Sequence, residues 1–432
     1  MRAVLRPLLI AGGLVVAAIS NAPVAVSAVP AGAASAPPCF GLAPTVVAEP
    51  GTTEVVGTEG DDVVVVSDVS RVITLGGDDT VCATGARWID AGDGDDRVRH
   101  RSTAGSWVVL GSGSDLFEGS DARDRVYAER FDGEDPYPGE GPDNTDVVRT
   151  YGGRDSVTTM AGPQGPDRDR VSLGDGDDTV TAYGLAPGDD RRLRGGAGRD
   201  TVVLTAAGAA GSELVVDLED GRARLDGETV AVADAFEDVV GRAGSADLTV
   251  LGTDGPNAIS VVGSAAVDAR GGRDRITLHG DPRSVRGGPG IDHVEVQGYA
   301  DLEDLPVRYD LHRRTFTRNG ATVPFAVEKL LVRSTGALRE DVVVLGTPGR
   351  DVVVMRACGG VVRGAGGDDV LRSRAEQCED TRTVLRGGPG DDRLSGDVDG
   401  EVLIGGAGRD RAVGGAGTDR CRAEIERECE LE

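Results

Sequence analysis

Residues 387–395 read GGPGDDRLS, and this nine-residue pattern decides the fold. It returns in degenerate form at 396–404 and then at 405–413 and 414–421, without a break in register. The consensus is G-G-x-G-x-D-x-U-x, in which U is an apolar residue. A repeat this short cannot bury its apolar face alone, so consecutive copies must stack into a solenoid.

Single copies of the pattern lie along the chain before this array. They occupy residues 57–65, 91–99, 110–118, 173–181, 195–203, 287–295 and 346–354, and shorter versions lie at 77–79, 272–274 and 367–369. The sixth-position aspartates Asp62, Asp79, Asp96 and Asp115 are 17, 17 and 19 residues apart. Two nonapeptides make about 18 residues, so each interval is interpreted as one coil of two short strands and two turns. The sequence therefore predicts an all-β fold, a parallel β-roll or β-solenoid with capped ends.

The coils are expected to form one long rod. About 20 coils stacked about 4.8 Å apart would make a rod on the order of 90–100 Å long. We expect Gly-Asp turns along one side of much of the rod and along both sides of the C-terminal array. Two stretches without these turns, at about 205–248 and 297–340, are expected to form longer strands or a hairpin.

The spacing of the repeats also predicts the parts of the chain. A longer duplication relates two modules whose matching residues are 93 to 100 positions apart. The predicted parts are an N-terminal solenoid at 37–192 with a loop insertion at about 128–146, the two modules at 193–285 and 286–385, and a tandem nonapeptide array with a C-terminal cap at 386–432.

The fixed place of the aspartates indicates a metal. Glycine permits turns with positive φ and lets backbone carbonyls point inward. Aspartates one coil apart lie above each other, and a column of unneutralised carboxylates would repel itself. A hard divalent cation between coils would be held by carboxylate and carbonyl oxygens at about 2.3–2.6 Å. The chain has no His or Cys set suited to zinc or copper, and magnesium keeps its waters, so calcium is the expected ion.

On these motifs the chain resembles the RTX, or haemolysin-type, calcium-binding repeat proteins. The resemblance implies that the first six residues of each copy form a metal-binding turn and the last three a short strand. The apolar U residues would then face the core: Val64, Val98, Phe117, Val180, Val202, Val294, Val353 and Leu394. The implied carboxylate ligands of several calcium ions are Asp62, Asp79, Asp96, Asp115, Asp178, Asp200, Asp274, Asp292, Asp351, Asp369, Asp392, Asp410 and Asp419. Two positions depart from the pattern, since Asn257 and Glu401 stand where the motif has Asp.

Two interpretations of these aspartates stay open. In the first, they are turn formers of a metal-free β-solenoid. In the second, which the recurrence of the acids at one fixed position favours, they bind calcium. Binding would then be coupled to folding, because charge repulsion and chain entropy outweigh a thin valine core.

The composition bounds the function. The 432 residues carry a formal net charge of −27, which argues against a nucleic-acid partner because phosphate binding needs a basic footprint. Neither a His-Glu-x-x-His motif nor a Gly-x-Ser-x-Gly motif occurs, so no catalytic residue is assigned and no enzyme is predicted. The alternative is a β-helix polysaccharide lyase or epimerase, for which Arg308, Tyr309 and His312 lie together in one non-repeat stretch.

The N-terminus reads as a secretory signal peptide. Arg2 and Arg6 precede an apolar run from Leu8 to Ile19, and small residues follow. The predicted signal spans 1–28, with cleavage as late as residue 36; an uncleaved anchor is the other interpretation. No transmembrane segment is expected after removal. The protein is therefore expected to be secreted, with a structural or adhesive role at or outside the cell surface and a cell-surface or extracellular polysaccharide as a candidate partner.

The six cysteines fit an oxidising compartment. Six cysteines allow 15 pairings. We favour Cys39–Cys82, Cys358–Cys378, which would fall on adjacent coils, and Cys421–Cys429, which would close a C-terminal cap. Metal binding by these thiols is the competing interpretation, but the sequence contains no Cys-x-x-Cys pair.

Overall fold

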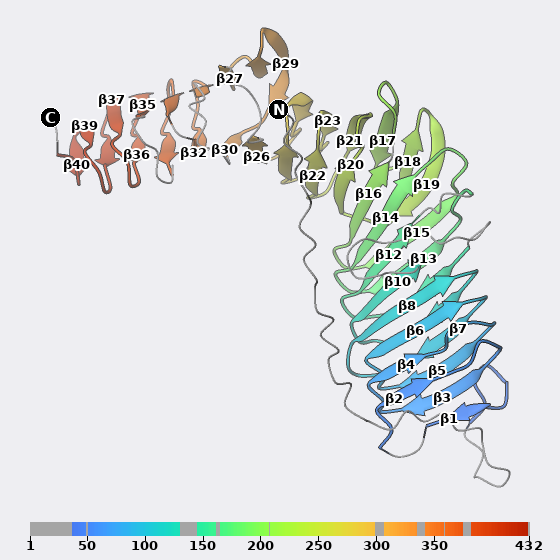
Figure 1. Ribbon diagram of the computed structural model, residues 1–432. Coiled ribbons are helices and arrows are strands. Elements are labelled where there is room, and N and C mark those ends of the chain that lie inside the picture. Colours follow the sequence, from blue (N-terminus) through green and yellow to red (C-terminus); the bar gives the residue numbers. More distant parts are fainter. Residues whose placement is uncertain are drawn as a thin grey trace, which may run out of the picture.

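The chain folds as a parallel β-solenoid, shown from blue to red in Figure 1. The computed structural model describes residues 37–48, 51–129, 145–160, 165–206, 208–298, 306–334, 342–357, 359–374 and 382–430. Within these ranges the regular structure is strand, wound into about 17 turns, and no helix is long and apolar enough to cross a membrane. The predicted fold class is confirmed. The predicted signal peptide lies outside the described residues, as do Cys358, Cys378 and most of the predicted loop insertion.

Two sheets form the walls of the solenoid, because the chain places alternate strands in opposite sheets. Sheet one stacks, in spatial order, β1 (Val46–Val47), β3 (Val63–Ser67), β5 (Thr80–Thr84), β7 (Arg97–His100), β9 (Leu116–Glu118), β11 (Val147–Arg149), β13 (Arg170–Asp175), β15 (Arg191–Ala197), β19 (Glu228–Asp234), β18 (Arg222–Leu225), β17 (Glu213–Asp217), β21 (Asp247–Leu251), β23 (Ala265–Asp268), β25 (Pro282–Arg286), β29 (Ala321–Ala326), β28 (Thr315–Arg318), β27 (Val307–Asp310), β31 (Val342–Leu345), β33 (Gly360–Arg363), β35 (Thr383–Pro389), β37 (Val402–Ala407) and β39 (Arg420–Arg422).

Sheet two contains one strand from each coil. In order it stacks β2 (Glu54–Val56), β4 (Arg71–Ile73), β6 (Trp88–Asp93), β8 (Ser106–Ser112), β10 (Asp124–Glu129), β12 (Ser156–Met160), β14 (Thr179–Leu185), β16 (Thr201–Ala206), β20 (Asp238–Arg242), β22 (Ala258–Val262), β24 (Arg275–His279), β26 (His293–Gly298), β30 (Lys329–Ser334), β32 (Val352–Arg356), β34 (Val370–Ser373), β36 (Arg393–Ser395), β38 (Arg411–Val413) and β40 (Ile425–Arg427). Every pairing in this sheet is parallel, as the repeat requires.

The core is a narrow column of aliphatic side chains between the two sheets. Burial alternates along the strands, so every second side chain points inward. Parallel pairing places Val64, Val81, Val98 and Phe117 directly above one another, and all four are fully buried. The other predicted apolar positions are buried as well: Val180, Val202, Val294, Val353 and Leu394.

Two antiparallel meanders interrupt the simple winding of sheet one. After β16 the chain runs through β17, β18 and β19 before it returns beside β15, and β27, β28 and β29 repeat the arrangement. These meanders occupy the described parts of the two stretches that lack Gly-Asp turns. Each adds two strands to sheet one that have no counterpart in sheet two, so the described residues give 22 strands against 18.

The extra strands bend the stack. Two extra strands at the usual spacing lengthen one face of the solenoid by about 10 Å. Because the two sheets are themselves about 10 Å apart, this difference in length must bend the stack. Sheet one is therefore expected on the outer side of a bend, and Figure 1 shows β27 and β29 outside the curve with β26 and β30 inside it. The solenoid has about 17 turns, fewer than the predicted 20, and it bends, which the sequence analysis did not anticipate.

Disulfides secure both ends. Cys39 and Cys82 are bonded with their Cα atoms 5.6 Å apart, which ties the N-terminal segment to β5. Cys421 and Cys429 are bonded with Cα atoms 5.8 Å apart, and between them β40 pairs with β38 to form the last strand of sheet two. Both predicted pairings are confirmed. Together they hold the terminal segments against the open ends of the core.

Candidate metal centre

Side chains at the turn position just before a strand form columns along the two edges of the solenoid, and most of them are sixth-position aspartates of the motif. Turns that lead from sheet two to sheet one lie on edge one, and turns that lead back lie on edge two. Column one, on edge one, contains Asp62, Asp79, Asp96, Asp115, Asp146 and Asp169. Column two, on edge two, contains Asp124, Asp155, Asp178, Asp200, Asn257, Asp274, Asp292, Asp351, Asp369, Asp392 and Asp410. Column three, again on edge one, contains Glu401 and Asp419.

All thirteen predicted ligands therefore occupy columns. As expected, much of the solenoid carries these turns on one edge and the C-terminal array carries them on both, but the edge that carries them changes along the chain. The column changes edge wherever the motif advances by one nonapeptide instead of two. Asp115 and Asp124 are nine residues apart, which is half a coil, and the same step separates Asp392 from Glu401. Half a coil carries the next turn to the opposite edge.

Hydrogen bonds between coils hold one oxygen of each acid. The backbone N–H of Asp62 donates to Oδ1 of Asp79 at 2.7 Å, and the N–H of Asp79 donates to Oδ1 of Asp96 at 2.8 Å. The same bond recurs along column two, where the N–H of Asp369 donates to Oδ1 of Asp392 at 2.9 Å. These bonds fix the carboxylates one above another at the spacing of the strands.

The second oxygen of most of these carboxylates has no donor. Among the described residues, Oδ2 is buried without a hydrogen-bond partner in Asp79, Asp96, Asp115, Asp146, Asp155, Asp169, Asp178, Asp200, Asp274, Asp292, Asp369, Asp392, Asp410 and Asp419. Burying a charged oxygen without a partner costs several kcal/mol, roughly, unless a cation or a proton compensates it. A repeated arrangement of this kind is the expected result of a bound metal.

The glycines leave room for these oxygens. A Cβ on Gly387 would lie 2.0 Å from Oδ2 of Asp392, and a Cβ on Gly405 would lie 2.3 Å from Oδ2 of Asp410. At the second position, a Cβ on Gly406 would lie 2.1 Å from the carbonyl oxygen of Gly388 in the preceding coil. Carboxylate and carbonyl oxygens thus line the same small space, and this all-oxygen set fits calcium.

Burial raises the pKa of the column carboxyls. Desolvation raises the pKa of Asp79 to about 7 and that of Asp96 to about 9, with neighbouring carboxylates adding to the effect. Desolvation likewise raises the pKa of Asp392 to about 6. The columns are therefore poorly suited to carry full charge without a counter-ion, and a divalent cation would bind in competition with protons.

A separate type of turn begins each run of stacked turns. In these head turns the N–H of the second residue donates to the acid of its own turn, and this residue is Thr or Ser except at Glu401, where it is Asp397. The N–H of Thr58 donates to Oδ2 of Asp62 at 2.7 Å, and the N–H of Thr347 donates to Oδ2 of Asp351 at 2.6 Å. Both oxygens of Asp351 also accept from the Thr347 hydroxyl. The carboxylates of Asp62 and Asp351, both predicted ligands, therefore already have donors from the protein.

The head-turn geometry explains why Asn257 replaces an aspartate. The N–H of Thr253 donates to Oδ1 of Asn257 at 2.8 Å, as in the other head turns. The side-chain amide of Asn257 donates in turn to the carbonyl oxygen of Glu237 at 2.6 Å. A neutral amide therefore meets the requirements of a head turn, which indicates that head positions do not depend on a carboxylate.

The turn after each head has its own signature. The shorter versions of the motif are complete six-residue turns whose second residue has positive φ without being glycine. These residues are Leu75 (φ 76°), Tyr151 (69°), Arg270 (62°) and Ala365 (79°). Turns with glycine at the second and fourth positions follow them. The runs that begin at Asp62, Asp124, Asn257 and Asp351 thus pass through one such intermediate turn, whereas Glu401 is followed directly by the turn of Asp419.

Several acids of the columns were missed by the sequence analysis. Asp155 follows Gly152-Gly153-Arg154 and has the same signature as Asp274, so the motif could have found it. Other runs end on a glutamate in a short turn, as where Oε2 of Glu237 accepts the N–H of Asp200 at 2.8 Å. Glu328, Glu424 and Glu430 accept the N–H groups of Asp292, Asp410 and Asp419 in the same way. Only strand pairing reveals these glutamates, because their turns lack glycine.

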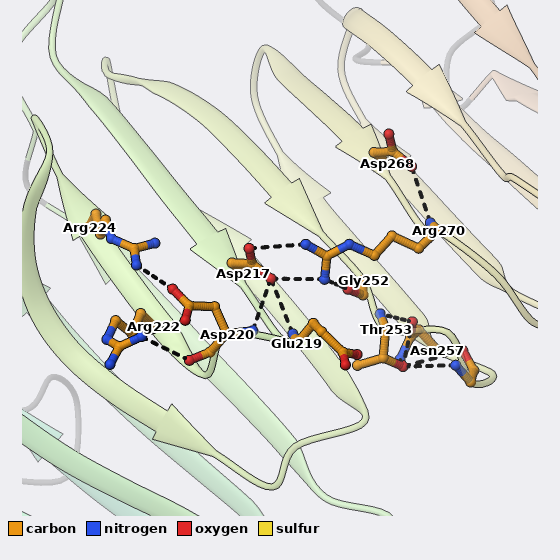
Figure 2. A network of polar contacts seen from close by, with 11 residues as sticks. Asp217, Glu219, Asp220, Arg222, Arg224, Gly252, Thr253, Asn257, Asp268 and Arg270 are labelled. Carbon is orange, nitrogen blue, oxygen red and sulfur yellow. Dashed lines mark hydrogen bonds and ion pairs between the residues drawn. The ribbon is translucent and has the colours of Figure 1, made fainter.

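Figure 2 shows how the first meander is fastened to a head turn. The guanidinium of Arg270 lies 2.9 and 3.0 Å from the two carboxylate oxygens of Asp217 at the end of β17. It also donates to the carbonyl oxygen of Gly252, the first residue of the head turn that contains Asn257, at 2.5 Å. Arg270 therefore joins the meander, the head turn and the following x-G-G turn in one network.

The residues of the enzyme alternative do not assemble a catalytic groove. Tyr309 is buried, and its ring packs 5.1 Å from that of Phe316 and 5.4 Å from that of Phe325. Arg308 pairs with Asp310 at 3.4 Å, while His312 is exposed on the turn that follows β27. Tyr309 therefore packs in the hydrophobic core of the second meander.

Comparison with known proteins identifies the C-terminal motif. The family model of the RTX calcium-binding nonapeptide repeat (4 copies) matches residues 382–400 and 395–424. No curated protein matches the chain. The matched residues span the last turns of column two and the whole of column three.

Proposed function

The chain carries RTX calcium-binding nonapeptide repeats, and from this premise we propose that calcium binds along all three columns and drives the folding of the solenoid. The observation that carries the proposal is the series of buried Oδ2 atoms without a donor, which extends far beyond the matched repeats. The turns from Asp79 to Asp115 and from Asp178 to Asp292 have the same carboxylate geometry as the turn of Asp392. We further propose that the protein is secreted and has a structural role outside the cell.

The experiment is a calcium titration of residues 37–432 after treatment with chelator, followed by far-UV circular dichroism. A cooperative gain of β signal with calcium, and little gain with magnesium at the same concentration, is expected. A strand spectrum that calcium does not change would refute coupled folding and leave a metal-free solenoid. Mass spectrometry of the protein recovered outside the cell tests export, since a mature chain that begins between residues 29 and 37 is expected.

An adhesive role has support from arginines on the outer faces of the sheets. Arg356, Arg372, Arg374, Arg393 and Arg411 line a cleft of about 570 Å³ across β32, β34, β36 and β38. None of the five forms an ion pair with another described residue. A smaller cleft of about 340 Å³ on sheet one contains Arg149, Arg170, Arg192 and Arg194. The acids lie at the edges and these arginines on the faces, so a face can bind an anion although the net charge is negative.

We therefore propose that the larger cleft binds an acidic polysaccharide. Arg393 pairs in register with Arg411 on the next coil, so their backbones lie at the strand spacing of about 4.8 Å, which suits two neighbouring carboxylates of a linear polymer with one carboxylate per sugar. Polygalacturonate is the probe and dextran the neutral control, with the calcium-loaded protein in both. Arg393→Gln combined with Arg411→Gln is expected to weaken polygalacturonate binding at least tenfold. Equal binding of dextran and polygalacturonate would refute the proposal.

A further inference from the structure

A group of buried acids lies at the C-terminal end of column one, outside the nonapeptide repeats. Glu129 ends β10, and Asp167 and Asp169 precede β13. Their carboxylate oxygens lie within 4.8 Å of one another, and all three side chains are almost fully buried. The three residues come from two coils, so strand stacking and not local sequence brings them together.

Arg191 supplies one positive charge to this group. Because Arg170 pairs with Arg192, Arg191 takes the position after Asp169 that an acid would take in column one. Its Nε lies 2.9 Å from Oδ2 of Asp167, and it is fully buried. The remaining guanidinium donors bind the carbonyl oxygen of Tyr183 at 2.7 Å and the Thr159 hydroxyl at 3.3 Å. Its Nη2 also lies 3.7 Å from Oδ2 of the buried Asp189, so the arginine is shared between two carboxylates and neutral groups.

The other carboxylates are only half satisfied. Glu129 accepts the N–H of Met160 at 2.8 Å through one oxygen, and Asp169 accepts the N–H of Asp146 at 2.8 Å through one oxygen. Oδ2 of Asp169 is buried without a hydrogen-bond partner among the described residues.

An acid outside this group provides a second, independent observation. Asp146 is fully buried, its Oδ2 has no hydrogen-bond partner among the described residues, and it interacts electrostatically with Asp169 and Glu129. Burial raises the pKa of Glu129, Asp146 and Asp169 well above their ordinary values, and the neighbouring acids raise them further. The carboxyl groups of Glu129, Asp167 and Asp169 therefore share an interior space with one guanidinium, with Asp146 bonded to Asp169 and Asp189 beside Arg191.

We propose that Glu129, Asp167 and Asp169 bind a hard divalent cation, calcium, at a site that no glycine turn encodes. The donors are carboxylate oxygens, without the imidazole or thiolate that zinc or copper would select. A divalent ion would offset two of the negative charges that Arg191, which is shared between Asp167 and Asp189, leaves unbalanced. The inference does not require the glycine turns to bind metal, because Glu129, Asp167 and Asp169 lie outside every G-G-x-G-x-D turn, although Asp169 is also the last acid of column one.

The test counts calcium ions bound by the full mature chain in equilibrium dialysis. Glu129→Gln is expected to bind one ion fewer than the parent, whereas the exposed Asp190→Asn on the same part of the solenoid is expected to bind the same number. Glu129→Asp keeps the charge and shortens the side chain. It is expected to retain the full count while one class of ion binds about tenfold more weakly, so it serves if Glu129→Gln fails to fold.

Each outcome decides a different point. An unchanged count and unchanged affinity in folded Glu129→Gln would overturn the proposal and mean that protons neutralise the group. A parent chain that binds no calcium would overturn the proposed function as a whole. A parent that binds a single ion, lost in Glu129→Gln, would support this site while refuting the columns.

Discussion

Asp392 and Asp351 occupy the same position in the motif, yet substitution by Asn is expected to affect them differently. Asp392 is a column carboxylate whose Oδ2 has no donor, and burial raises its pKa to about 6. Asp351 is a head residue whose carboxylate accepts the N–H and the hydroxyl of Thr347. Asp392→Asn should therefore remove a calcium ligand, whereas Asp351→Asn should reproduce the arrangement that Asn257 already has.

The expected change in unfolding free energy on Asp392→Asn follows from the pKa of Asp392. A carboxyl whose pKa rises from 3.8 to about 6 on folding binds more protons in the folded state, so it destabilises the calcium-free fold as pH rises. At about pH 8 that cost is about 3 kcal/mol. The buried amide of Asn leaves one N–H group unpaired, which costs about 1–2 kcal/mol. Asp392→Asn should thus stabilise the calcium-free protein by about 1–2 kcal/mol at about pH 8.

The assay is urea unfolding at about pH 8, in chelator and in excess calcium, with Asp351→Asn as the matched control. Asp392→Asn should raise the unfolding midpoint in chelator and lower it in calcium. The difference between the two conditions should therefore shrink. Asp351→Asn should leave this difference within about 0.5 kcal/mol of the parent, as expected when no ligand is lost. Equal loss of the calcium effect in both variants would refute the distinction between head and column residues.

The remaining predictions concern the whole stack. Calcium-free protein should lose stability as pH rises from about 4 to about 9, since burial raises the column pKa values, that of Asp96 to about 9; urea midpoints that rise with pH would contradict this. Gly405→Ala, whose Cβ would meet Asp410, should lower the midpoint in calcium by about 2 kcal/mol or more. Gly60→Ala, which meets nothing within 4 Å, should change it little. Reduction of the two described disulfides should lower the melting temperature in calcium without removing the β spectrum, because they hold the ends and not the coils.

Much of the fold could be predicted because the repeat carries its own geometry. The period of 18 residues fixes two strands and two turns per coil, and the apolar residue after each aspartate, such as Val64 or Leu394, fixes which face is buried. The glycines mark turns in which a side chain would collide with an oxygen of the same or the preceding coil. These are local requirements, so a single sequence reveals them.

The candidate site was harder to predict where the acid lies outside the motif. Glu237 and Glu328 extend column two from turns without glycine, and only the pairing of β16 with β20 and of β26 with β30 places them there. The status of Asp62 and Asp351 also depended on a backbone donor, which the motif does not distinguish. Sequence spacing gives the position of a carboxylate, whereas its hydrogen-bond partners decide whether an oxygen is left for a metal.

The sequence by itself determined the coil, the buried face and the aspartate columns, because each follows from contacts between residues one coil apart. The tertiary structure decided which edge each column follows, where the solenoid bends and how column one ends. Those features depend on half-coil steps, on the four meander strands without a counterpart in the opposite sheet, and on Arg191 at the position of an acid. Each arises from strand pairing that accumulates over several coils, and a nine-residue pattern does not encode that pairing.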